Sequence, residues 1–479
     1  MTRPVIPIVP VADAAARTVS LYASEQKIYP RAVHGRFAFW RWALVWATQL
    51  VFYGLPWLEW NGRQALLFDL EARRFYIFGL VLYPQDFIYL TVLLVLSAGA
   101  LFLFTAVAGR LWCGFACPQT VYTEIFLWVE RHLEGDRAAR MKLDAAPWSA
   151  NKLLRKGGKQ AAWIGIGLWT GFSFVGYFTP IRTLAAEALA LNLGAWEGFW
   201  TLFYGFATYG NAGWMREQVC KYMCPYARFQ SAMFDRDTLV ISYDPQRGEP
   251  RGSRPRSADP KALGKGDCID CTLCVQVCPT GIDIRRGLQY ECIGCAACID
   301  VCNGVMDKMD YPRGLIRYAT QNGMDGRWTQ GQMWRRVLRP RVLIYGAGML
   351  AISVAFTASL VLRSPFKVDV VRDRGTLARL VDDGRIENVY RLQLMNASEA
   401  PQRYRIGVSG LPQVAVASTA EVAVGPAEAR WVAVRVQLPP QVARTLGAGA
   451  HAIGFEVQQL GGDGPGPAVL EKSTFVVPR

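Results

Sequence analysis

Cysteine is the residue type whose number and spacing could carry chemistry in this chain. Eight of the twelve cysteines lie between positions 268 and 302, in two runs with the spacing C-x2-C-x2-C-x3-C. In proteins that hold two [4Fe–4S] clusters, the first three thiolates of such a run bind one cluster and the fourth binds the other. The two runs therefore predict two clusters. The expected ligands are Cys268, Cys271, Cys274 and Cys302 for the first cluster, and Cys292, Cys295, Cys298 and Cys278 for the second.

Zinc is the alternative occupant of a site with four thiolates. Zinc sites usually take paired C-x2-C motifs separated by a longer spacer, whereas both runs here are complete and close together. The spacing therefore favours iron–sulfur clusters. Pro279 follows the first run, but Asn303 stands where a second proline is common, so the second run departs from the standard pattern without a change in its expected ligands.

The other four cysteines form two C-x3-C-P units, Cys113 with Cys117 and Cys220 with Cys224. Each unit follows an apolar segment, so the chain contains an internal repeat of helix, outer loop, helix and thiol pair. In a helical backbone, cysteines four residues apart would share one face. Soft sulfur ligands suit copper or a reversible dithiol exchange, and a four-thiol site built from both units could also hold a further cluster. The alternative is that these cysteines are small, buried apolar residues.

Histidine is scarce, and this limits the cofactors that the chain can bind. His34, His132 and His451 all lie outside the centres of the apolar segments, and no C-x2-C-H motif is present. We therefore expect no haem with histidine ligands.

Five apolar segments are long enough to cross a bilayer, which takes about 20 helical residues. They predict a bundle of about five transmembrane helices, at 37–58, 87–108, 161–179, 196–215 and 342–362. Lys and Arg are concentrated in the N-terminal tail and in the segments 109–160 and 216–341. The positive-inside rule places these parts in the cytoplasm and the chain beyond position 363 in the periplasm. The net charge of +15 therefore indicates a membrane with anionic lipid rather than nucleic acid.

The C-terminal part predicts an immunoglobulin-like β-sandwich, because apolar and polar residues alternate in short runs such as 390–394 and 453–457. The fold class is thus a multi-domain membrane protein. Its expected parts are a cytoplasmic tail (1–36), four transmembrane helices with both C-x3-C-P units (37–230), a ferredoxin domain (231–341), a fifth transmembrane helix (342–362) and a periplasmic immunoglobulin-like domain (363–479).

Several stretches of the chain resemble the CcoG family, also called FixG or RdxA. The resemblance rests on the segment from Gly213 to Met233, the two cysteine runs, the segment Asp310–Tyr318 and the segment Val371–Gly375. It implies a bacterial inner-membrane accessory protein for assembly of cbb3-type cytochrome oxidase. That protein would act as a cupric reductase, and its expected partners are assembly factors, copper carriers and an unknown cytoplasmic electron donor. A homo-oligomer is possible.

Placed on these residues, the expected mechanism is an electron relay that ends at copper near Cys113, Cys117, Cys220 and Cys224, with copper as substrate or transient ligand. Two other functions stay open. One is a membrane quinol dehydrogenase subunit, and the other is a copper chaperone or assembly scaffold without enzymatic activity.

Overall fold

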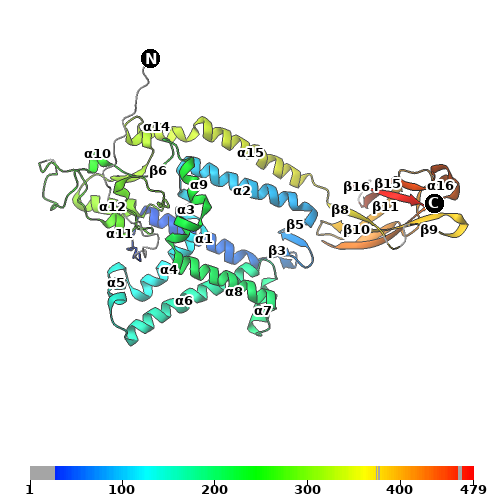
Figure 1. Ribbon diagram of the computed structural model, residues 1–479, viewed down its shortest axis with the longest axis horizontal. Helices are drawn as coiled ribbons and strands as arrows, with labels where there is room; N and C mark the ends of the chain where they lie inside the picture. Colours follow the sequence, from blue (N-terminus) through cyan, green and yellow to red (C-terminus); the bar gives the residue numbers. More distant parts are fainter. Residues whose placement is uncertain (1–26, 261, 374, 376–377, 462–465, 479) are drawn as a thin grey trace, which may run out of the picture.

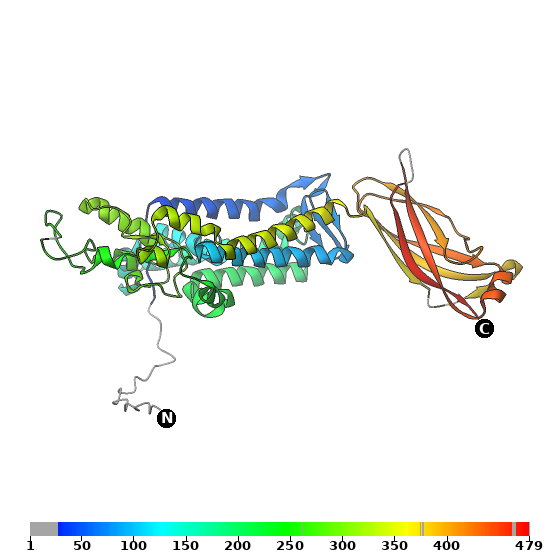
Figure 2. The same cartoon turned by 90° about the horizontal axis from the view of Figure 1, so that it is seen from above.

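The computed structural model describes residues 27–478 except 261, 374, 376–377 and 462–465. Residues 1–26, most of the expected N-terminal tail, lie outside the described residues. The chain forms an elongated molecule in which long helices occupy the middle (Figures 1 and 2). The cysteine-rich part lies at one end and the C-terminal β-sandwich lies at the other.

Five long helices run along the molecule in the order in which the apolar segments predict them. They are α1 (Arg36–Gly54), α2 (Phe87–Ala108), α6 (Ala150–Val175), α8 (Ala195–Tyr209) and α15 (Pro340–Val361). Further helices lie between them: α3 (Leu111–Phe115), α4 (Pro118–Glu134), α5 (Arg137–Ala145), α7 (Ile181–Leu189) and α9 (Pro225–Met233). Two π-helical turns, η3 (Gly210–Met215) and η4 (Val219–Met223), follow α8.

Two of the five helices are long and apolar enough to cross a membrane, namely Pro84–Ala108, which contains α2, and α15. Their apolar windows are 0% and 6% buried, so their side chains face outward rather than into a core. The other three expected spans correspond to α1, α6 and α8, and a five-helix transmembrane bundle remains a prediction. Helix α6 begins at Ala150 with a basic half, and α8 has 15 residues before its π-helical turn.

Small residues let two of these helices approach closely. A Cβ atom at Gly171 of α6 would lie 2.9 Å from the backbone nitrogen of Gly205 in α8, and one at Gly167 would lie 2.7 Å from the Gly205 carbonyl oxygen. Close backbone approach through glycine is the common way to pack helices in a membrane, where lipid and side chains are equally apolar. The pair α6 and α8 is thus stabilised by close packing of the two backbones at these glycines.

The cysteine-rich part is built around a two-stranded antiparallel sheet, β6 (Val240–Tyr243) and β7 (Ile316–Ala319). Its helices are α10 (Pro245–Gly248), α11 (Leu273–Gln276), α12 (Ala297–Met309), α13 (Gln321–Met324) and α14 (Gln330–Arg335). Thr272 and Ala296 precede α11 and α12 in the left-handed conformation, at φ 56° and 59°. Each stands directly after the second cysteine of its run, so the sequence repeat is also a backbone repeat.

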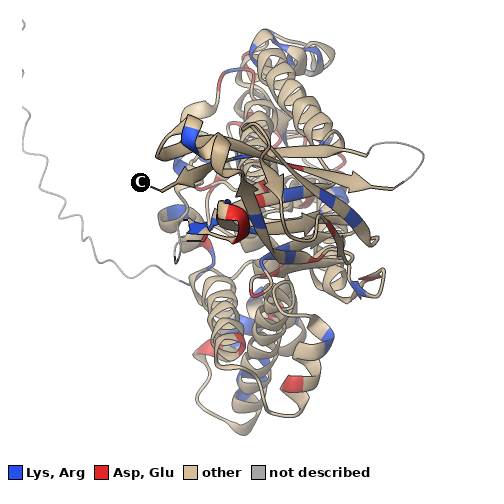
Figure 3. Cartoon of the chain, turned by 90° about the vertical axis from the view of Figure 1, so that its right-hand side faces the viewer, with Lys and Arg blue, Asp and Glu red and all other residues tan. Residues whose placement is uncertain are grey.

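The C-terminal domain is a sandwich of two antiparallel sheets, in the orders β12-β14-β10-β8 and β13-β11-β15-β16, with β9 paired to β10. Tyr390, Leu392 and Leu394 are fully buried as the alternation predicts, whereas Arg391 is exposed. Lys, Arg, Asp and Glu are interspersed over this domain (Figure 3). Its elements are β8 (Phe366–Arg372), β9 (Arg379–Leu380), β10 (Ile386–Asn396), β11 (Gln402–Ser409), β12 (Ala415–Val416), β13 (Glu421–Val424), β14 (Ala429–Leu438), α16 (Pro440–Leu446), β15 (Gly449–Leu460) and β16 (Ala468–Val477).

A small outer sheet joins the helices to this sandwich. Its strands are β3 (Leu66–Asp69), β4 (Arg74–Ile77) and β5 (Leu80–Leu82), preceded by the hairpin of β1 (Glu59–Trp60) and β2 (Arg63–Gln64). Tyr83 packs in one cluster with Met395 and Ala397 of the sandwich and donates its hydroxyl to the carbonyl oxygen of Asn396 at 2.9 Å. Asp86 pairs with Lys367 at 2.5 Å.

At the opposite end, Asp300 of α12 fixes the start of α1. Its two carboxylate oxygens accept hydrogen bonds from the backbone N–H groups of Phe37 at 3.1 Å and Ala38 at 2.7 Å. The first N–H groups of a helix have no partner within the helix, and a carboxylate there also complements the helix dipole. The cysteine-rich part therefore supplies the N-terminal cap of the first long helix.

The substitution Asp300→Ala removes both acceptors and leaves two N–H groups without a partner at a buried position. Because a buried donor without an acceptor costs about 1–3 kcal/mol, we expect a clear fall in the melting temperature of the purified protein in detergent. Asp307→Ala, on the same helix but with a surface ion pair to Arg313, is the matched control and should change little. Equal melting temperatures for the two variants would show that the cap does not stabilise the junction.

Candidate electron-transfer site

The structure gathers the first predicted cluster set around one cavity. Cys268, Cys271, Cys274 and Cys302 all line it. The rest of its wall includes the apolar side chains of Ile269, Leu273, Val305, Met306, Leu315 and Ile316. Four thiols from two distant parts of the sequence, in an apolar pocket, are a donor set that fits an iron–sulfur cube.

A second cavity holds the second predicted set. Cys278, Cys292, Cys295 and Cys298 line it together with Ile241, Ile282, Ile284 and Ile293. Cys274 borders both cavities. The crossed arrangement, in which the fourth cysteine of each run joins the other run, therefore agrees with the shape of the fold. The assignment of these eight thiols as cluster ligands remains a prediction.

Burial disfavours ionisation of two of these thiols, one from each run. Burial raises the pKa of Cys274 to about 11 and that of Cys302 to about 12. Metal ligation needs the thiolate, so binding of a cluster has to offset this desolvation. Among the residues that the structure describes, no three His, Cys, Asp or Glu side chains converge as for a single metal ion. A cube takes its thiolates on separate iron atoms, so its ligands surround a volume instead of a point.

The two C-x3-C-P units occupy breaks between helices. Cys113 lies in α3, and Cys117 is the extended residue before Pro118, the first residue of α4. Cys220 lies in the π-helical turn η4, and Cys224 is the extended residue before Pro225, the first residue of α9. Proline is favoured at the first position of a helix because its missing N–H would have no partner there. The condition for a shared helical face is therefore not met, since the second cysteine of each pair is extended and precedes a helix start.

The four thiols of these units nevertheless meet in one region. Burial raises the pKa of Cys220 to about 12, and Cys117, Cys113 and Cys224 each add to this rise. Burial likewise raises the pKa of Cys113 to about 11, opposed by a hydrogen bond with Gln230. The charge of each of the other three sulfurs thus acts on Cys220, but among the described residues the four thiols do not converge as for a single metal ion.

Gln230 of α9 links the two units directly. Its side chain is fully buried, and its amide nitrogen lies 3.3 Å from the Cys113 sulfur. In the opposite direction, Gln119, which follows Cys117, donates to the carbonyl oxygens of Asn211 at 2.8 Å and Arg216 at 3.0 Å. Each unit thus supplies contacts to the other. No spacing in the sequence signals the role of Gln230.

The first C-x3-C-P unit also rests directly on the second cysteine run. A Cβ atom at Gly114 would lie 2.6 Å from the carbonyl carbon of Gly294 and 2.7 Å from the nitrogen of Cys295. A Cβ atom at Gly294, whose φ is +72°, would lie 2.9 Å from the carbonyl oxygen of Arg110. The two glycines therefore allow backbone contact between the membrane-side thiols and the second cluster cavity.

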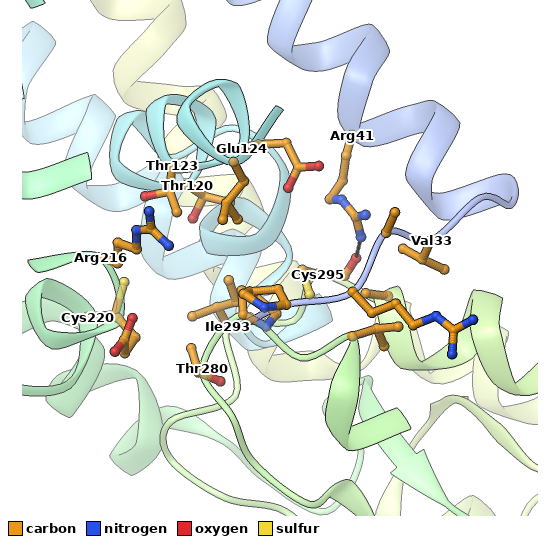
Figure 4. Close-up of a pocket in the computed structure, with 18 of the residues that line it drawn as sticks. Val33, Arg41, Thr120, Thr123, Glu124, Arg216, Cys220, Thr280, Ile293 and Cys295 are labelled. Atoms are coloured by element: carbon orange, nitrogen blue, oxygen red, sulfur yellow. Dashed lines mark hydrogen bonds between the residues drawn. The ribbon is translucent and has the colours of Figure 1, made fainter. Parts of the chain in front are cut away.

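A further cavity, of about 60 Å³, lies between the two kinds of thiol site. Figure 4 shows Cys220 and Arg216 on one side, and Arg41 on the other with its guanidinium bonded to the carbonyl oxygen of Cys295. Thr120 and Glu124 of α4 also line it. Cys220 and Cys295 thus border one cavity.

Comparison with known proteins agrees with this arrangement. Residues 215–321 match a model described as a 4Fe-4S dicluster domain, and residues 90–134 match one described as a 4Fe-4S binding domain. Residues 356–478 match the immunoglobulin-like fold at the C-terminus of FixG. The nitrogen fixation protein FixG of Rhizobium meliloti is 38% identical over 431 residues, which are 84% of this chain and 82% of FixG.

The chain belongs to the FixG and RdxA family. Protein RdxB of Cereibacter sphaeroides is 40% identical over 412 residues, covering 84% of this chain and 85% of RdxB. Protein RdxA of the same organism is 38% identical over 400 residues, covering 81% of this chain and 84% of RdxA. This member of the family is therefore an iron–sulfur protein of electron transfer with a C-terminal immunoglobulin-like domain, as the sequence predicts.

Gly114→Ala tests the contact between the thiol unit and the second cysteine run. The added methyl group meets backbone atoms that cannot rotate away, and overpacking of this kind costs about 1–3 kcal/mol. We expect a lower melting temperature and a changed electron paramagnetic resonance (EPR) spectrum for the second cluster. Gly165→Ala in α6, where the Cβ would meet nothing within 4 Å, is the control. If both variants behave like the natural protein, the close approach has no functional consequence.

Single replacements of the fourth cysteines test the crossed ligand sets. Cys302→Ser should remove the cluster that Cys268, Cys271 and Cys274 hold, and Cys278→Ser should remove the other one. Each variant should keep about half of the iron and sulfide, and the two should leave different EPR spectra. Identical residual spectra, or loss of the cluster from the cysteine's own run, would contradict the crossed assignment.

Proposed function

We propose that this protein is a membrane-embedded electron-transfer enzyme that reduces Cu(II) to Cu(I) for assembly of a cbb3-type cytochrome oxidase. The observation that carries the proposal is the backbone contact of Gly114 with Gly294 and Cys295. It joins the second cluster cavity to a region where four further thiols meet. A one-electron redox site next to a soft-ligand site suits a metal whose change of oxidation state is a single electron.

The residues of this chain have separate tasks in that reaction. The eight cysteines of the two runs would hold the clusters, whose chemistry is one-electron transfer. Cys113, Cys117, Cys220 and Cys224 would bind copper, and because thiolates are soft ligands they stabilise Cu(I) over Cu(II). One electron from a cytoplasmic donor thus converts one Cu(II) ion to one Cu(I) ion. The four thiols have to draw together around the ion, since they do not converge on a point in the part of the chain that the structure describes.

The outward-facing apolar side chains support a location in a bacterial inner membrane. In a water-soluble protein, helices as apolar as α2 and α15 would be covered, but only 0% and 6% of their apolar windows are buried. Lipid is the natural neighbour of such surfaces. We infer a multi-pass protein with the cysteine-rich part in the cytoplasm, because Lys and Arg gather at that end, and with the sandwich in the periplasm. There the sandwich would be available to oxidase assembly factors and copper carriers.

A further cluster at the four C-x3-C-P thiols is a second candidate. It is favoured by the match of residues 90–134 to a 4Fe-4S binding model, since Cys113 and Cys117 are the only cysteines in that stretch. A cube there would need Cys220 and Cys224 as its other ligands. Iron and sulfide analysis separates the candidates, because a further cluster adds half as much iron again to the content of two.

The test is an anaerobic reduction assay on the protein purified in detergent. The reduced protein is mixed with Cu(II) and a chromophore specific for Cu(I), and cluster oxidation is followed by absorbance and EPR. We expect one Cu(I) for each electron lost. The quadruple variant Cys113→Ala, Cys117→Ala, Cys220→Ala and Cys224→Ala should keep the clusters of the two runs but lose most of the Cu(I) formation.

Three outcomes would contradict the proposal. Full copper reduction by the quadruple variant with intact clusters would remove copper from the four thiols. If added quinol reduces the clusters and Cu(II) does not oxidise them, the protein is a quinol dehydrogenase subunit. If the clusters never change oxidation state during copper transfer, the protein is a scaffold.

A further inference from the structure

Two buried arginines lie against the second cysteine run without a carboxylate partner. Arg41 of α1 is 5% exposed and donates from Nη1 to the carbonyl oxygen of Cys295 at 2.6 Å. Arg110, between α2 and α3, is 6% exposed and donates to the carbonyl oxygens of Cys292 at 3.3 Å and Ala227 at 2.6 Å. The Nε atom of each has no acceptor. Glu124 lines the same cavity as Arg41, but the ion pair that it forms is with Arg131, at 3.9 Å.

A buried guanidinium without a counter-charge is costly. Removing an ion from water costs several kcal/mol unless an opposite charge compensates it. Backbone carbonyl oxygens supply only partial charges, and two such arginines converge on one run of four cysteines. A cube bound by four thiolates is anionic, so it would supply the negative charge that both arginines lack.

The first cysteine run has a weaker positive environment. Arg285 lies near Cys274 but is paired with Asp283 at 2.8 Å and also with Asp270. Arg254 is buried without a described ion pair and donates to the carbonyl oxygen of Cys268 at 3.5 Å. One uncompensated cation thus faces the first run, at a longer distance, and two face the second.

We propose that Arg41 and Arg110 are the counter-charges of the second cluster and hold its reduction potential above that of the first. Adding an electron makes a cluster more negative, so a nearby cation stabilises the reduced form, and the net charge around a cluster is one of the factors that set its potential. Electrons then collect at the second site, which is the one in backbone contact with the Cys113 unit. The inference does not depend on copper as the final acceptor.

The test is an anaerobic redox titration of the full protein, followed by EPR, on Arg41→Gln and Arg41→Lys. Arg41→Gln keeps a hydrogen-bond donor but removes the charge. At a fixed potential it should lower the ratio of reduced to oxidised second cluster about tenfold, which is about 59 mV for a one-electron couple. The reduction potential of the first cluster should stay the same, and Arg41→Lys should keep most of the natural potential of the second cluster. Arg254→Gln is the reciprocal control and should lower only the first cluster's potential.

A merely structural role for Arg41 predicts a different result. The proposal fails if Arg41→Gln leaves both potentials unchanged or moves them equally, or if Arg41→Lys shifts the second cluster as far as Arg41→Gln does. If Arg41→Gln does not retain its clusters, Cys278→Ser and Cys302→Ser give the order of the two potentials directly. The cluster that remains in Cys278→Ser should have the lower potential, and the opposite order would overturn the proposal.

Discussion

The arrangement of the redox site depends on the side chain of Arg110. This residue stands between α2 and α3, directly before the first C-x3-C-P unit, and its guanidinium reaches the carbonyl oxygens of Ala227 and Cys292. It therefore connects the end of an apolar helix, the helix after the second C-x3-C-P unit and the second cysteine run. Gly294 can sit against the Arg110 carbonyl oxygen because it has no side chain. Apolar packing of Leu111 and Phe115 against the cysteine-rich core holds the two loops together with this connection.

A group of buried charges around Glu130 stabilises the segment that leads to Cys220. Glu130 of α4 pairs with Arg140 at 2.8 Å, Arg216 at 3.2 Å and Lys159 at 3.6 Å. Burial alone would raise the pKa of Glu130, but the three cations outweigh it, so the pKa is lowered and the carboxylate is charged. Because a buried charge that loses its partners is strongly destabilising, this group of charges ties the turn that carries Cys220 to α4 and α6.

Much of the fold and part of the site could be predicted from sequence. The alternation of apolar and polar residues in 390–394 and 453–457 predicts strands because one face of each strand is buried. The spacing of the eight cysteines predicts cluster ligands because each run is short enough to wrap around one iron–sulfur cluster. Arg41, Arg110 and Gln230 could not be found this way, since their partners lie 254, 182 and 117 positions away. The helix breaks at Cys117 and Cys224 are signalled by the prolines that follow, but the π-helical turn around Cys220 has no comparable mark.

The mutual contacts of the two C-x3-C-P units impose an order on biosynthesis. Cys113 has no Gln230 beside it until the ribosome has made another 117 residues, and the α1 cap waits for Asp300, which lies 263 residues beyond Phe37. Such long-range contacts form late in folding. Until then the segment that carries Cys113 and Cys117 has to fold without the side chains that later pack against it. Completion of these contacts therefore has to follow translation of Gln230 and Asp300.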